Sequence, residues 1–273
     1  MTDKVPVLSM VFMSITGLMA FAIPVALLLW YRKKKHADIL PFFIGCAVMM
    51  AFALTLESIV HTIVLSTSPG QKIKSNIWLY ALYGGAMAGL FEETGRWIAF
   101  KTVLKKRQGK NANALMYGAG HGGFEAAMIV GTAMISNLVM AVLINMDAMS
   151  YITGSLEGEV LEQIDTAVKT LVTTSPYMFL ASLAERISTI ILHIALSVLV
   201  WFAAKNRKRW ILFPAAILIH LAVDALSVIL SGAGTPVAVT EAAIAVMALL
   251  TAVFSKKIWD SEIAAEATVQ EPV

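Results

Sequence analysis

The chain has 273 residues, a net charge of +3 and a single cysteine, Cys46, which excludes an internal disulfide. Because 58% of the residues are hydrophobic and only 14% are charged, against about 25% charged residues in soluble domains, we expect a multi-pass protein of the cell membrane. The basic clusters flank apolar segments and lack interleaved aromatic residues, which argues against nucleic-acid binding.

Seven apolar runs are each long enough to cross a bilayer, which takes about 20 residues. The first run contains small residues that resemble a signal-peptide cleavage region, but it is too long for one and ends in four basic residues. The fourth run is long, and we expect it to tilt or break near its glycines. The runs cover residues 7–31, 40–65, 77–100, 114–144, 177–204, 211–230 and 237–254.

The distribution of basic residues predicts the orientation of these runs. The loops after the first, third, fifth and seventh runs hold 15 of the 21 Lys and Arg residues, and the opposite side holds only Lys4, Lys72, Lys74 and Lys169. Positive charge marks the cytoplasmic side, so the N-terminus is expected outside and the C-terminus in the cytoplasm.

The fold class that follows is all-α, a bundle of seven transmembrane helices formed by residues 1–258. The acidic loop 145–176 is then extracytoplasmic, and its pattern predicts a short amphipathic helix over residues 156–172. Residues 259–273 are polar and are expected to form a disordered cytoplasmic tail.

The third run carries Glu92, Glu93 and Arg96 inside an otherwise apolar sequence. An ionisable group at such depth costs about 2.5–3.5 kcal/mol on insertion scales and usually faces a bundle interior or a wet cavity. Arg96 is four residues from Glu92 and three from Glu93, so it can pair with either carboxylate.

Three other runs place polar residues one helical turn apart, on one helix face. At 1.5 Å per residue, these groups and Glu92 all lie about 12–20 Å from the cytoplasmic basic clusters. Such pairs can be structural links between helices, but a common depth on four helices favours a shared cavity for acid–base hydrolysis. The pairs are His121/Glu125, His193/Ser197 and His220/Asp224.

Two more ionisable residues are expected in the outer half of the bundle. Glu57 and Arg186 lie roughly 25–30 Å from the cytoplasmic clusters. Because arginine stays protonated, a buried Arg186 needs an anion. We therefore expect a structural ion pair between Glu57 and Arg186.

Metal ligation is the alternative chemistry. His121, His193 and His220, with Glu92 or Glu125, would form a zinc site of three imidazoles and a carboxylate. The His-Glu-x-x-His signature of helical zinc proteases does not occur. We therefore expect no metal ion and no other cofactor, with zinc as the alternative.

The order of these motifs resembles the type II CAAX-protease and bacteriocin-processing superfamily of intramembrane glutamate proteases, which includes the PrsW branch. That group has a Glu-Glu motif followed by Arg or Lys, then Phe-x-x-x-His or Phe-x-x-x-Glu, then His-x-x-x-Asn/Asp. Here the motifs are Glu92-Glu93-x-x-Arg96, His121-x-x-x-Glu125 and His220-x-x-x-Asp224. The chain looks most like the YhfC-like membrane peptidases, and the resemblance covers residues 80–226.

The resemblance implies an intramembrane peptidase with its core at residues 77–232, acting on a membrane protein or membrane-proximal peptide in contact with the lipid bilayer. A proton-coupled transporter or a non-catalytic membrane scaffold would use the same buried residues. By family analogy Glu92 activates water, Glu93 and Arg96 orient it, His193 and His220 donate protons, and Glu125 and Asp224 orient imidazoles, with His121 in the same set.

The loop charges predict that residue 105 faces the cytoplasm and residue 165 the outside. Lys105→Cys and Asp165→Cys, each made in a Cys46→Ser background, should react with an impermeant maleimide from opposite sides of the membrane. Reaction of residue 165 from the cytoplasmic side alone would overturn the seven-span topology.

Overall fold

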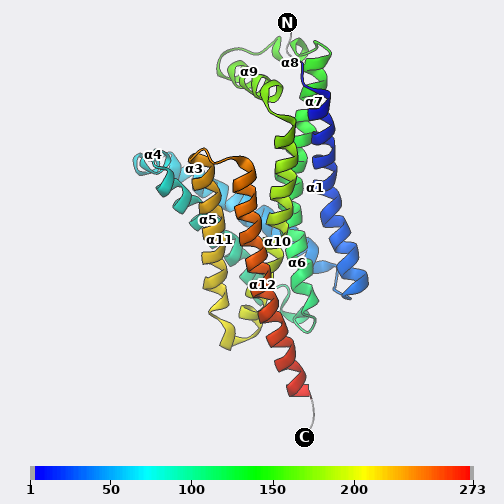
Figure 1. The fold of residues 1–273 in the computed structure, drawn as a ribbon. Helices are drawn as coiled ribbons and strands as arrows, with labels where there is room; N and C mark the ends of the chain where they lie inside the picture. The colour runs from blue at the N-terminus through cyan, green and yellow to red at the C-terminus, as the bar shows by residue number, and fades with distance from the viewer. Residues whose placement is uncertain (1–3, 271–273) are drawn as a thin grey trace. The chain divides into compact units, whose positions relative to one another are not determined.

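Every regular element in the computed structural model, which describes residues 4–270, is helical, and this confirms the all-α prediction. Two elements, η1 and η3, are π-helical, and two, η2 and η4, are short 3-10 turns. In chain order the elements are α1 (Val7–Lys34), α2 (Leu40–Val48), η1 (Met49–Glu57), α3 (Ser58–Leu65), α4 (Ser68–Lys74), α5 (Ile77–Lys101), η2 (Lys105–Arg107), α6 (Ala112–Ala126), η3 (Ala127–Gly131), α7 (Thr132–Asn145), α8 (Ser150–Thr153), α9 (Gly158–Thr173), α10 (Pro176–Lys205), η4 (Arg207–Arg209), α11 (Leu212–Gly232) and α12 (Val237–Gln270) (Figure 1).

Six helical stretches among the described residues are long and apolar enough to cross a membrane, which supports a multi-pass membrane protein. The remaining expected run is α5, which Glu92, Glu93 and Arg96 make less apolar than the others. The seven-helix count and the orientation of the termini stay predictions. The six stretches are 7–34, 40–65, 112–145, 176–205, 207–232 and 237–268.

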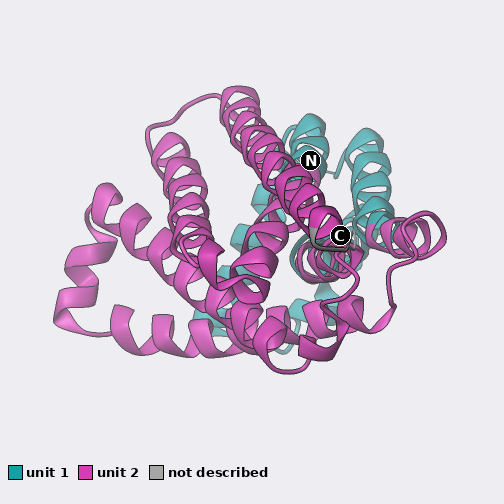
Figure 2. Cartoon of the chain, turned by 90° about the horizontal axis from the view of Figure 1, so that it is seen from below, with its two compact units in different colours: residues 1–23, 126–186 teal, residues 24–125, 187–273 magenta. Residues whose placement is uncertain are grey.

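The chain divides into two compact units, which Figure 2 colours separately. Unit 1 contains residues 1–23 and 126–186, and unit 2 contains residues 24–125 and 187–273. The boundaries fall inside α1 and α10 and at the junction of α6 with η3. All eight candidate site residues belong to unit 2.

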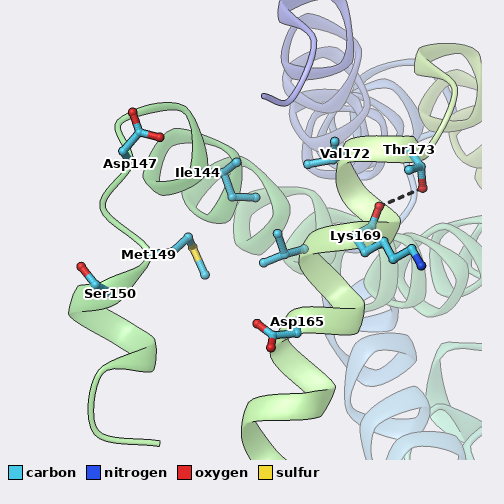
Figure 3. Close-up of a pocket in the computed structure, with 9 residues that line it drawn as sticks. Ile144, Asp147, Met149, Ser150, Asp165, Lys169, Val172 and Thr173 are labelled. Atoms are coloured by element: carbon cyan, nitrogen blue, oxygen red, sulfur yellow. Dashed lines mark hydrogen bonds between the residues drawn. The ribbon is translucent and has the colours of Figure 1, made fainter. Parts of the chain in front are cut away.

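Unit 1 has a small apolar core that Met13, Met134 and Phe179 help to form. Its α9 confirms the short amphipathic helix expected at residues 156–172, and its apolar side packs on this core through Leu171. A pocket of about 550 Å³ lies between α9 and the α7–α8 segment. Figure 3 shows Asp165 of α9 among the side chains that line it.

Unit 2 is built around α10. Residues 190–204 of α10 are buried apart from Ile191 and Ile194, which are half-buried. The core of unit 2 contains an aromatic cluster, in which the ring centroid of Phe100 lies 4.7 Å from that of Tyr117 and 5.0 Å from that of Trp201. These contacts join α5, α6 and α10, the helices that carry most of the site.

Glycines let the helices of unit 2 approach until their backbones touch. A Cβ added at Gly85 of α5 would lie 2.5 Å from the carbonyl oxygen of Leu221, and one at Gly89 would lie 2.8 Å from that of Ile217. Both carbonyls belong to α11. In α6, a Cβ at Gly120 would collide with the Phe42 carbonyl of α2. The helices are therefore close enough for short side chains to meet across them.

The last helix is longer than the sequence pattern indicates. The seventh run was expected to end at residue 254, with a disordered tail over 259–273, but α12 continues to Gln270 (Figure 1). Residues 271–273 lie outside the described residues. The tail contains good helix formers, such as the alanines between 264 and 267.

Ion pairs explain why this extension is ordered. Glu262 accepts hydrogen bonds from Arg209 Nε at 2.5 Å and from Asn206 at 3.1 Å. One turn further on, Glu266 accepts a hydrogen bond from Lys205 Nζ at 2.6 Å. The polar residues of the α12 extension therefore bind the end of α10 and the loop that follows it, a segment about 50–60 residues earlier in the chain.

The close contact of α5 with α11 predicts that alanine substitutions at two adjacent glycines differ sharply in their effect on stability. Gly85→Ala should lower the thermal unfolding midpoint, because overpacking a contact of this kind costs about 1–3 kcal/mol. Gly84→Ala is the matched control: a Cβ there meets nothing within 4 Å, so the midpoint should stay the same or rise. Equal midpoints for the two variants, measured on purified protein, would contradict the contact.

Candidate active site

The face of α5 that touches α11 also carries the charged residues. Gly85 and Gly89 lie on this face, and Glu92, Glu93 and Arg96 continue it at helical spacing. All three charged side chains are buried in unit 2. The expectation that these residues face an interior and not the lipid therefore agrees with the structure.

Arg96 pairs with Glu93, which decides between the two partners that its spacing allows. Its Nη1 donates to Glu93 Oε2, and both side chains are completely buried. Its Nη2 donates to Nδ1 of His193 at 3.1 Å. The other oxygen of Glu93 lies 2.9 Å from Nδ1 of His220. One guanidinium and one carboxylate thus connect α5 with α10 and α11.

Glu92 faces two histidines instead. Its Oε2 lies 2.9 Å from His121 Nε2 and 3.8 Å from His193 Nδ1. One donor atom from each of Glu92, His121 and His193 lies within 4.8 Å of the other two, and all three residues are buried. Carboxylate and imidazole groups from α5, α6 and α10 therefore converge on one point.

Two further carboxylates contact the Nε2 atoms of His193 and His220. Glu125 Oε2 lies 2.7 Å from His193 Nε2, and Asp224 Oδ2 lies 3.4 Å from His220 Nε2. The side chains of Glu125 and Asp224 are 12% and 37% exposed, whereas the histidines are almost fully buried. These two carboxylates are therefore the most exposed of the eight candidate side chains. The structure brings all eight candidate residues into one network.

The donors at Glu92 fit a catalytic zinc site in type and spacing. Two imidazoles and one carboxylate are an established zinc ligand set. Ligands about 2.0–2.1 Å from a tetrahedral zinc lie about 3.3 Å from one another, and the separations of 2.9 and 3.8 Å bracket that value. The zinc alternative from the sequence named His220 as a third imidazole. In the structure, His220 lies with Glu93 and Asp224 instead.

Two tyrosine contacts were missed in the sequence, one at the site and one at the Glu57–His61 pair. Tyr117 stacks on the His121 ring, with centroids 5.9 Å apart, and its position one turn before His121 could have indicated it. Tyr83 lies 3.0 Å from Nδ1 of His61, whose Nε2 lies 3.0 Å from Glu57. No local spacing signals the Tyr83 contact, because it joins separate helices.

The expected pair of Glu57 and Arg186 stays a prediction. Glu57 binds His61, one turn along the same helical stretch. Arg186 donates to Glu185, its neighbour in sequence. Each residue thus has a partner close to it in the chain.

Comparison with known proteins identifies relatives. A family model described as YhfC intramembrane metalloprotease matches residues 19–249, a range that contains all eight candidate residues. A curated relative, the "Uncharacterized membrane protein YhfC" of Bacillus subtilis (strain 168), is 36% identical over 214 residues, which cover 78% of this chain and 81% of that protein. No solved structure matches.

The buried pair of Arg96 and Glu93 predicts strong coupling between them. Glu93→Gln should sharply reduce folded protein, because removing one partner of a buried ion pair costs about 3–5 kcal/mol. Glu93→Gln combined with Arg96→Met should recover part of the loss, measured by monodisperse yield and thermal midpoint. The exposed pair of Lys256 and Asp260 is the control, and Asp260→Asn should leave both readouts unchanged. A double variant no better than Glu93→Gln alone would refute the coupling.

Proposed function

The chain belongs to the YhfC intramembrane metalloprotease family, and we propose that it hydrolyses peptide bonds of membrane or membrane-proximal proteins at the Glu92 centre. Membership supports peptidase chemistry in general and confirms the resemblance to YhfC-like peptidases. The observation that carries the proposal is the buried convergence of Glu92, His121 and His193. The expectation of a site without metal finds no support in the comparisons.

We propose that Glu92, His121 and His193 hold a zinc ion. When bound, the metal would supply a Lewis acid that polarises the scissile carbonyl and acidifies water. The family description, the donor types and the donor separations support this assignment. The buried position of the three residues would also keep bulk water away from the reacting groups.

The surrounding residues would orient the reacting groups. Glu125 accepts the Nε2 proton of His193 in this assignment and so directs Nδ1 toward Glu92. Glu93 neutralises Arg96 and fixes His220. His220, with Asp224 on its other nitrogen, is the residue we assign to protonate the leaving amine.

One observation favours a second mechanism without metal. Arg96 donates to Nδ1 of His193, and Glu125 occupies Nε2, so both ring nitrogens of His193 are engaged. In that arrangement Glu92 would act as general base on a water molecule. This is the mechanism that the resemblance to glutamate proteases implies.

The catalytic assignments predict loss of cleavage in single variants. Glu92→Gln, His193→Ala and His220→Ala should each lower cleavage by at least about a hundredfold, because each removes an acid, a base or a stabilising group. Proteomics of new N-termini in membrane fractions, comparing wild type with Glu92→Gln, should reveal the substrates. A transporter or a scaffold would give no difference in products. Cleavage by Glu92→Gln within tenfold of wild type, about 1.4 kcal/mol, would remove Glu92 from the reaction.

Metal content separates the two mechanisms in the same variants. Under the zinc assignment, purified wild type carries one zinc per chain, and Glu92→Gln and His121→Ala carry none. His36→Asn is the control, because His36 lies in the loop after α1, away from the site, with a backbone φ of 52° that asparagine tolerates. Purified protein that contains no metal and keeps cleaving after chelation would refute zinc and support Glu92 as general base.

A further inference from the structure

A groove of about 530 Å³ in unit 2 is formed by α1, α6, α10 and α12. Ile191, Ile194 and Val198 line it from α10, and Ile191 and Ile194 are the two residues that interrupt the buried stretch 190–204. Ala252 of α12 faces them. These residues therefore form an apolar side of the groove, its trough.

The other part of the groove carries polar and aromatic side chains. Tyr31 and Lys35 line it from the end of α1, and Lys256, Trp259 and Asp260 line it from α12. On α12, the lining residues 252, 255, 256 and 259 form one stripe at helical spacing, about 10 Å long at 1.5 Å per residue. The lining thus combines the apolar trough with a cationic and aromatic set of side chains at its mouth, where Lys35, Lys256 and Asp260 are exposed.

The charges at the mouth favour an anion. Lys35 and Lys256 contribute two ammonium groups, and Asp260, which pairs with Lys256 at 2.6 Å, contributes one carboxylate. Lysine binds phosphate as a point charge. Tyrosine and tryptophan are the side chains that concentrate at the headgroup level of membranes.

We propose that this groove binds an anionic phospholipid, with its phosphate between Lys35 and Lys256 and an acyl chain along Ile191, Ile194 and Val198. Basic pockets between transmembrane helices bind anionic headgroups in this way. The apolar trough distinguishes the site from one for free phosphate, and the two lysines distinguish it from a surface for an apolar helix. The proposal does not depend on peptidase activity, although Ile194 is adjacent to His193 on α10.

Lipid retention tests the proposal. Purified full-length chain in neutral detergent would be given equal amounts of phosphatidylglycerol and phosphatidylcholine with the same acyl chains, and bound lipid would be counted by native mass spectrometry. Wild type should retain phosphatidylglycerol by about fivefold or more over phosphatidylcholine. Lys35→Ala with Lys256→Ala should abolish this preference.

A matched pair of lysines provides the control. Lys34 and Lys257 are exposed neighbours of Lys35 and Lys256 that do not line the groove, so their double alanine variant should keep the preference. Equal loss in both double variants, or no preference in wild type, would refute the site. Displacement of the lipid by millimolar inorganic phosphate would mean that free phosphate is the ligand, which would also refute it.

Two single substitutions extend the test, and the first should increase lipid retention, a result that misfolding cannot produce. Asp260→Asn removes the carboxylate that pairs with Lys256, so it should increase retention of phosphatidylglycerol and leave phosphatidylcholine unchanged. Ile194→Trp should fill the trough and lower retention of both lipids. Unchanged retention in both variants would refute the lipid site.

Discussion

A guanidinium that cannot lose its proton lies in the apolar interior of unit 2, and the arrangement of the site follows from that constraint. Arg96 needs a carboxylate, and Glu93 supplies it at full burial. Because Glu93 is engaged in this way, it is Glu92 that faces His121 and His193. Glu92 and Glu93 have the same chemistry, yet they have different roles. The difference comes from the residues that each one contacts.

Such short side chains can reach one another only because the helices that carry them touch. Carboxylates and imidazoles extend only a few ångströms from their backbones, so a contact like that of Glu93 with His220 requires closely packed helices. Gly85 and Gly89 bring α5 against α11, and Gly120 brings α6 against α2. The polar network and the glycine contacts therefore depend on each other, since the network would be costly in hydrocarbon without its partners.

Much of this arrangement can be predicted from sequence, because hydrophobic runs and pairs at helical spacing are local signals. The spans, the amphipathic α9 and the convergence of the eight residues belong to this class. The partner of Arg96 could not be predicted, because the i,i+3 and i,i+4 spacings are equally good. The helical extension to Gln270 was missed because its polar residues are stabilised by Lys205, Asn206 and Arg209, and pairing across distant segments leaves no periodic signal.

The π-helical segment η1 ends at Glu57, whose carboxylate is bound to His61 and, through that ring, to Tyr83 of α5. A π-helix holds more residues per turn than an α-helix. One residue added to continuous α-helical winding would rotate everything after it by about 100°, whereas a π-helical segment takes up an extra residue in its wider turns and keeps the residues after it in phase with those before it. With one residue fewer, residues 49–57 would therefore wind as an ordinary α-helix and would still present the His61 ring to Tyr83. This segment can therefore lose one residue during divergence without changing the helix face that carries His61.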